Sequence, residues 1–209
     1  MAATRPFRLR AVAAPAPKPA SSAPSPVLPI RTPRWLPSPN YTPGRAASPV
    51  ALAIHTMGGG FDGCGSWFAS PASQVSSHYG AALDGRLDQY VGLEHTAWVN
   101  GRPEPGNRWG EVLDAAGVAG WVRDLNPNTL VVGIETDDAG SGATAVTDAL
   151  YAATRDACRL ALRRYPGLVV VTGHHVISPS SRKNCPGKRW TASGRLAQLA
   201  RELGLALVA

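Results

Sequence analysis

The first 50 residues of this 209-residue chain contain no aspartate and no glutamate. Their arginine and lysine side chains supply the whole formal net charge of +7, because acidic and basic residues balance in the rest of the chain. A basic segment attracts anionic partners such as envelope polymers, or is simply solvated. The rest of the chain lacks a basic platform interleaved with aromatic residues, which argues against specific nucleic-acid binding.

Long hydrophobic runs are also missing. No segment approaches the roughly 20 apolar residues of a membrane helix, so we expect no transmembrane segment. The N-terminus begins with basic residues, but Pro15, Pro17 and Pro19 interrupt any apolar run of signal-peptide length. We therefore expect no secretory signal.

Cysteine is scarce, and three residues do not make a disulfide framework. Cys64 and Cys158 either pair with each other or remain buried thiols. We favour thiols, because a free cysteine packs as a small hydrophobic side chain.

Proline is concentrated at the N-terminus, where residues 1–46 hold more than half of the 19 prolines. Because proline lacks a backbone donor, this stretch cannot form regular ladders. We predict a disordered, basic Pro/Ala-rich arm over residues 1–34 and a single domain over residues 35–209. Trp35 and Tyr41 are expected to hold residues 31–46 across the domain as an ordered strap.

The hydrophobic pattern of the remaining chain alternates between strand and helix periods. It predicts strands over residues 50–54, 129–135 and 168–172, a hairpin over 76–91 with its turn at Asp84-Gly85, a helix over 145–164, and a final helix carrying Leu196, Leu199, Ala200 and Leu203. The fold class is therefore α/β, with a central mixed β-sheet flanked by helices.

Several potential metal ligands lie at or just after predicted strand ends. His55 follows the first strand, His174 and His175 follow the third, and Cys185 lies in a loop rich in proline and serine. A catalytic zinc takes three protein ligands and keeps one position open. Spacing alone leaves open whether these residues are ligands or ordinary polar residues.

Five short motifs make the pattern more specific. In order, they are Ile54-His55-Thr56, Ser77-His78-Tyr79 with Asp84-Gly85, Gly133-Ile134-Glu135, Gly173-His174, and Lys183-Asn184-Cys185-Pro186-Gly187. The series resembles the type 2 N-acetylmuramoyl-L-alanine amidases, which include phage endolysins, bacterial cell-wall amidases and animal peptidoglycan recognition proteins. The resemblance runs from about residue 35 to the C-terminus.

The resemblance implies a site and an activity. Zn²⁺ would be held by His55, His174 and Cys185, with His174 favoured over His175 because it directly follows the strand-end glycine. Glu135 and Lys183 would be the catalytic residues. The reaction would be hydrolysis of the amide bond between N-acetylmuramic acid and L-alanine in peptidoglycan. The protein would be a monomer that acts at the bacterial cell wall, either phage-encoded and released or exported.

The sequence departs from the family pattern in two places. Ser77 stands where some members carry a catalytic tyrosine, which moves the expected proton transfer to Glu135. Val99 stands where the family usually has histidine, and the neighbouring Trp98 either lines the groove or packs in the core. Two alternatives stay open: a non-catalytic peptidoglycan-binding module on the same fold, and a structural zinc domain with His175 or Cys64 as fourth ligand.

Overall fold

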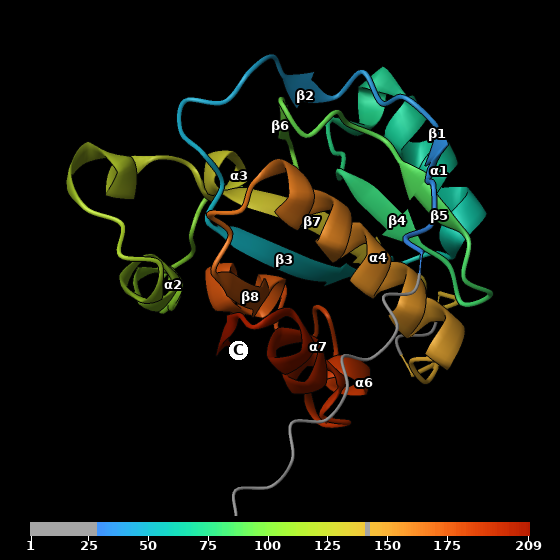
Figure 1. The fold of residues 1–209 in the computed structure, drawn as a ribbon. Helices are drawn as coiled ribbons and strands as arrows, with labels where there is room; N and C mark the ends of the chain where they lie inside the picture. The colour runs from blue at the N-terminus through green and yellow to red at the C-terminus, as the bar shows by residue number, and fades with distance from the viewer. Residues whose placement is uncertain (1–28, 141–142) are drawn as a thin grey trace, which may run out of the picture.

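A seven-stranded sheet forms the centre of the molecule in a computed structural model that describes residues 29–140 and 143–209 (Figure 1). Across the sheet, the strands are β1 (Arg34–Trp35), β5 (Leu87–Gln89), β4 (Tyr79–Ala81), β7 (Val131–Thr136), β3 (Ala51–Thr56), β8 (Val170–Gly173) and β9 (Ala206–Val208). Neighbouring strands are parallel except for the antiparallel hairpin of β4 and β5. The predicted mixed sheet of an α/β fold is confirmed.

Helices cover both faces of this sheet. They are α1 (Phe61–Ala69), α2 (Trp109–Ala115), α3 (Pro127–Leu130), α4 (Asp148–Arg164), α5 (His174–Ile177), α6 (Lys188–Thr191) and α7 (Arg195–Leu203), with 3₁₀ turns at Pro71–Ser73 and Gly120–Asp124. One face packs against α4, α6 and α7, and the other against α2, α3 and α5. In Figure 1, α4 crosses in front of the sheet, where it packs on β4 and β7.

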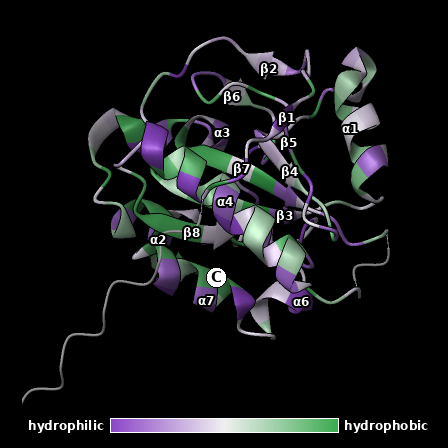
Figure 2. Cartoon of the chain, turned by 45° about the vertical axis from the view of Figure 1, so that its right-hand side comes forward, coloured by the Kyte–Doolittle hydropathy of each residue, from purple (hydrophilic) through white to green (hydrophobic). Residues whose placement is uncertain are grey.

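The central strands are hydrophobic over most of their length, as the green ribbons of Figure 2 show, and the polar residues of β3 and β7 lie at their carboxyl ends. Successive side chains of a strand point to opposite faces. Leu52 and Ile54 therefore pack under α4 and α7, while Ala51 and Ala53 face α2 and α3. Burying each large aliphatic side chain stabilises the fold by about 1.5–3 kcal/mol, which pins the register of β3 against its neighbours.

Several predicted element boundaries differ from the structure by one to three residues, and local capping explains two of them. The predicted helix over 145–164 begins only at Asp148, because the Thr147 hydroxyl accepts a hydrogen bond from the backbone N–H of Leu150 and caps it there. The predicted strand over 129–135 begins at Val131, because the preceding four residues form α3, capped by the side chain of Asn126.

The strap from residue 31 to 46 is ordered. Its strand β1 adds to the sheet edge beside β5, and β2 (Tyr41–Thr42) pairs with β6 (Thr96–Ala97) in a second, two-stranded sheet. Arg34 also donates two hydrogen bonds to the Asp88 carboxylate, at 2.9 and 2.8 Å. Residues 1–28 of the predicted arm lie outside the described residues, so the boundary at residue 34 stays a prediction.

The hairpin of β4 and β5 turns where the sequence predicted. Gly85 has φ of 91°, a conformation that favours glycine in a tight turn. The Tyr90 ring lies directly against Gly80, so a Cβ at this position would clash with the phenol oxygen of Tyr90. The hairpin thus depends on its glycines for both the turn and the packing.

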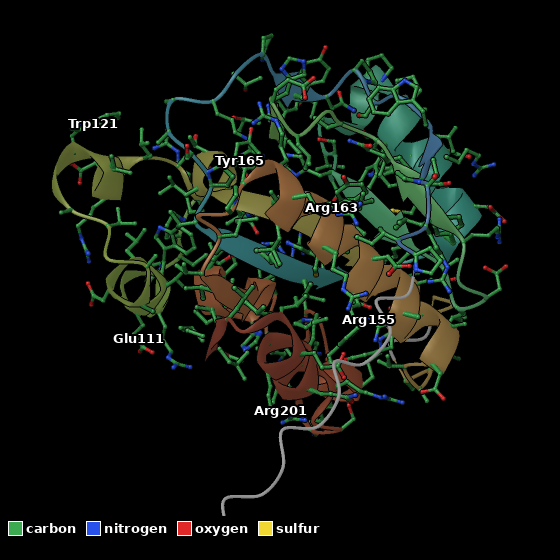
Figure 3. All side chains as sticks on the ribbon, viewed as in Figure 1. Glu111, Trp121, Arg155, Arg163, Tyr165 and Arg201 are labelled. Atoms are coloured by element: carbon green, nitrogen blue, oxygen red, sulfur yellow. The ribbon has the colours of Figure 1, made fainter. Side chains whose placement is uncertain are left out.

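Figure 3 shows Arg155 and Arg163 on α4, where Arg155 pairs with Glu202 of α7 at 3.4 Å. Trp121, 64% exposed, sits at the tip of the segment between α2 and α3. No helix among the described residues is long and apolar enough to cross a membrane. Within the same residues, all three cysteines are free. The thiols favoured for Cys64 and Cys158 are thus unpaired, but only Cys158 is buried and Cys64 is partly exposed.

Candidate metal and active site

Three parallel strands end at one edge of the sheet, and their registers bring two functional residues together. His55 on β3 pairs directly with Glu135 on β7, so both side chains point to the same face. That face is the one opposite α4, because the intervening Ile54 and Ile134 belong to the cluster under α4. Ligands commonly bind at the carboxyl ends of strands in such sheets.

The third strand supplies a histidine to the same edge. Strand β8 ends at Gly173, and helix α5 begins at His174. Nε2 of His174 lies 3.0 Å from the backbone oxygen of Asn100, which leaves Nδ1 of the ring for another partner. The His55 and His174 rings lie with their centroids 4.6 Å apart.

The adjacent His175 points elsewhere. Its Nδ1 and its backbone N–H both lie 2.9 Å from the carbonyl oxygen of Cys185, and its ring is half-buried. A side chain on Gly173 would strike Nδ1 of His175 at 2.7 Å and Cδ of Pro186 at 2.6 Å. The glycine before the histidine doublet therefore lets the Cys185 loop close over the end of β8.

That loop brings the Cys185 thiol to the histidines. Sγ of Cys185 accepts a hydrogen bond from the backbone N–H of Thr56, at 3.3 Å, directly beside His55. The potential ligand atoms of His55, His174 and Cys185 all lie within 4.8 Å of one another, and all three residues are buried. Among the described residues, no fourth His, Cys, Asp or Glu joins this group.

The electrostatics of this group suit a metal ion. Burial lowers the pKa of His55 well below its usual value, the neighbouring His174 lowers it further, and the polar side chain of Asn100 opposes the shift. Burial also lowers the pKa of His174 to about 4. Both rings are therefore neutral near pH 7, the form in which imidazole binds a metal.

The thiol completes a zinc-like donor set. Burial raises the pKa of Cys185, so the thiol keeps its proton until a cation displaces it. Two neutral imidazoles and one thiolate form a set known from catalytic zinc sites, with a fourth position left for water or substrate. The residues present thus fit a zinc ion, on the chemistry of the donors and on their mutual distances.

Glu135 lies beside the donors. Its Oε1 is 3.8 Å from Nδ1 of His55, and its Oε2 is buried without a partner among the described residues. Burial raises the pKa of Glu135 to about 8, the nearby Asp138 raises it further, and Arg182 lowers it. A carboxyl group poised near neutral pH can both accept and return a proton.

These residues open into a pocket of about 630 Å³. The metal group and Glu135 lie in it, and Lys183 on the exposed loop lines it as well. Trp98 also lines the pocket, with its indole N–H donating to the Thr42 hydroxyl at 3.0 Å, so it belongs to the groove and not to the core. Sequence reasoning missed Trp67, an exposed residue of α1 on the same pocket, because a lone tryptophan carries no spacing signal.

His78 has a structural place, away from the metal group. Its ring is completely buried, and Nδ1 accepts a hydrogen bond from the backbone N–H of Gly133 at 3.1 Å. Nε2 lies 2.6 Å from Nη2 of Arg45 and 3.2 Å from the carbonyl oxygen of His95. The preceding Ser77 is fully buried and, within the described residues, its hydroxyl has no hydrogen-bond partner.

Comparison with known proteins now identifies the family. Residues 45–188 match the model of the Amidase_2 family, described as N-acetylmuramoyl-L-alanine amidase. The chain belongs to this family. It is also 28% identical over 158 residues to N-acetylmuramoyl-L-alanine amidase A of Achromobacter lyticus, a match that spans 66% of this chain and 76% of that protein.

Solved structures show the same fold. A selenomethionine derivative of AmpD is 26% identical and superposes with a TM-score of 0.59 over 80% of this chain and 93% of AmpD. PlyL, 18% identical, gives a TM-score of 0.57 over 83% of this chain and 97% of its own. AmiD from E. coli, in complex with anhydro-N-acetylmuramic acid-L-Ala-D-gamma-Glu-L-Lys, is 24% identical with a TM-score of 0.52, over 77% of this chain and 60% of that chain.

Proposed function

We propose that this protein is a zinc-dependent hydrolase that cuts the amide bond between N-acetylmuramic acid and L-alanine in peptidoglycan. The observation that carries the proposal is the convergence of two neutral histidines, one cysteine and a buried glutamate at one sheet edge. The family membership supports the substrate and the bond. The alternative of a non-catalytic binding module lacks such support, because every expected ligand position is filled.

His55, His174 and Cys185 would hold the ion. Zinc bound by such a set supplies a Lewis acid that polarises the scissile carbonyl and lowers the pKa of water. The pocket beyond these three residues is large enough for a sugar and the first residues of a peptide, and its tryptophans offer flat apolar faces to them.

Glu135 would act as the general base and acid. Its carboxylate removes a proton from the attacking water and delivers it to the nitrogen of the departing L-alanine. The site places this group on a rigid strand, so its direction is fixed before the substrate arrives. Because residue 77 is a serine, position 77 offers no tyrosine hydroxyl for proton transfer, and this role is assigned to Glu135.

Lys183 would stabilise the negative charge that develops on the carbonyl oxygen. The ammonium group sits on the same loop as Cys185, so the fold that positions the thiol also brings the charge to the pocket. The protein would act at the bacterial cell wall, in keeping with the amidase family, and the monomeric state stays a prediction from the sequence. Contact of the basic N-terminal arm with anionic envelope polymers remains part of the prediction.

Glu135→Gln tests the assignment of the base. The amide keeps the shape of the side chain but cannot take a proton, so we expect zinc content to stay at one equivalent and kcat to fall about 10²–10⁴-fold. Glu111→Gln is the matched control: Glu111 lies on α2, exposed and paired with Arg108. Full activity of Glu135→Gln on peptidoglycan, with the control unchanged, would show that the base lies elsewhere.

A further inference from the structure

Asn100 lies behind both histidines of the metal group. It belongs to the segment that follows β6, and it is only 3% exposed. The side-chain oxygen of Asn128 accepts hydrogen bonds from the backbone N–H groups of Asn100, at 2.6 Å, and of Val99, at 3.2 Å. Asn128 is itself part of the short helix α3, so the backbone at Asn100 is anchored from the side away from the site.

The carbonyl of Asn100 faces His174. Its oxygen lies 3.0 Å from Nε2 of that ring, and the contact is buried. Because a carbonyl only accepts hydrogen bonds, the proton of the neutral imidazole must sit on Nε2. The lone pair of His174 is then on Nδ1.

The side chain of Asn100 faces His55. It lies close enough to raise the pKa of the His55 ring, and Nε2 of His55 and both amide heteroatoms of Asn100 are buried with no hydrogen-bond partner among the described residues. Leaving a buried polar atom without a partner destabilises the folded state, so these atoms have a strong reason to pair. A hydrogen bond from Nε2–H of His55 to Oδ1 of Asn100 would satisfy one of these atoms in each residue and would leave the lone pair of His55 on Nδ1.

We propose that Asn100 is a positioning residue that fixes the same tautomer in both histidines, through its carbonyl for His174 and through its side-chain oxygen for His55. Both rings then present Nδ1 to a divalent cation, and Nδ1 of His55 is also the atom near Glu135. The sequence motif around Trp98 thus has a role that the family resemblance did not assign to it. The inference rests on the proposed zinc site.

The two halves of this arrangement are separable by substitution. Asn100→Ala removes the side-chain acceptor but keeps the carbonyl, so only His55 loses its partner. Asn100→Asp keeps an oxygen at the same place. Outer partners of metal-bound histidines typically contribute about 10–100-fold in metal affinity. We expect Asn100→Ala to weaken zinc binding by about that factor, and Asn100→Asp to stay within a few-fold of wild type.

The experiment is competition for zinc against a chelator of known affinity, on the full-length protein, with thermal unfolding to show that each variant is folded. Asn107→Ala is the control, since among the described residues Asn107 forms hydrogen bonds only within its own loop and with the start of α2. Zinc affinity of Asn100→Ala equal to wild type would overturn the proposal. Weak zinc binding by the wild type itself would instead count against the proposed function.

A second measurement needs no substitution. In wild-type protein loaded with zinc and labelled with ¹⁵N-histidine, long-range proton–nitrogen NMR spectra report which ring nitrogen carries the proton. We expect His55 and His174 both to carry it on Nε2. A proton on Nδ1 of either ring would overturn the proposal even if Asn100→Ala failed to fold.

Discussion

Replacement of His78 by asparagine should make the protein much less sensitive to mild acid. Burial lowers the pKa of His78 to about 3, the charge of Arg45 lowers it further, and a hydrogen bond to the carbonyl of His95 only partly opposes this. The unfolded chain has an ordinary histidine pKa of about 6.5. At pH values between the folded and the unfolded pKa of His78, the unfolded state therefore binds a proton on this ring and the folded state does not.

The direction and the size of the change in stability with pH follow from the difference between the folded and unfolded pKa of His78. Above about pH 6.5 His78 is neutral in both states and leaves the stability unchanged. As the pH falls from about 6.5 towards 3, each unit removes about 1.4 kcal/mol from the free energy of unfolding. Between pH 7 and pH 5, His78 alone should account for a loss of about 2 kcal/mol. An asparagine can still accept from the backbone N–H of Gly133 but has no proton to bind.

Urea unfolding at pH 7 and pH 5, in zinc-saturated buffer, measures the contribution of His78 to the free energy of unfolding. Contributions from all other groups, including the metal site, are common to wild type and variant and cancel in the difference. We expect His78→Asn to lose about 2 kcal/mol less than wild type between the two pH values, whatever its absolute stability. Ser77→Ala, a neighbouring change without an ionisable group, should track wild type. Equal losses in wild type and His78→Asn would refute the assigned protonation state of this buried ring.

Three further predictions concern the site and the fold. Cys185→Ala should lose stoichiometric zinc and activity, whereas His175→Ala should retain zinc in metal analysis; the reverse result would exchange the two residues in the ligand set. Lys183→Gln should lower kcat about 10²–10³-fold with little change in KM, and an unchanged kcat in steady-state kinetics would remove the oxyanion role. Thr147→Ala should lower the free energy of unfolding by about 1 kcal/mol in urea titration, and no loss would discount the cap of α4.

Much of the fold could be predicted because its strands and helices have strong local signals. The buried strand ending near His55, the hairpin with its Asp84-Gly85 turn, and the long helix before Pro166 all occur. Boundaries were less accurate, since a single side-chain cap at Thr147 or Asn126 decides where a helix begins. Such a cap sets the first residue of a helix, and the hydrophobic pattern along the sequence does not contain the hydrogen bond that forms it.

The functional site, like the fold, could be predicted only in part from the sequence. The family resemblance assigned His55 and Glu135 to one site, and the structure adds their direct pairing through the register of β3 and β7. The choice of His174 over His175 came from the resemblance, and the structure places only the first in the group. Asn100 could not be found, because its relation to the histidines arises from a loop crossing that no local pattern encodes.

The most direct test of the central claim is the release of stem peptides from purified peptidoglycan, with chelator and with zinc restored. The account predicts free peptides that begin with L-alanine, loss of release when the chelator removes the metal, and recovery when zinc is returned. Unchanged release in the presence of chelator would contradict zinc dependence. Tight zinc binding without cleavage of any wall type would contradict the proposed hydrolysis and favour a peptidoglycan-binding module.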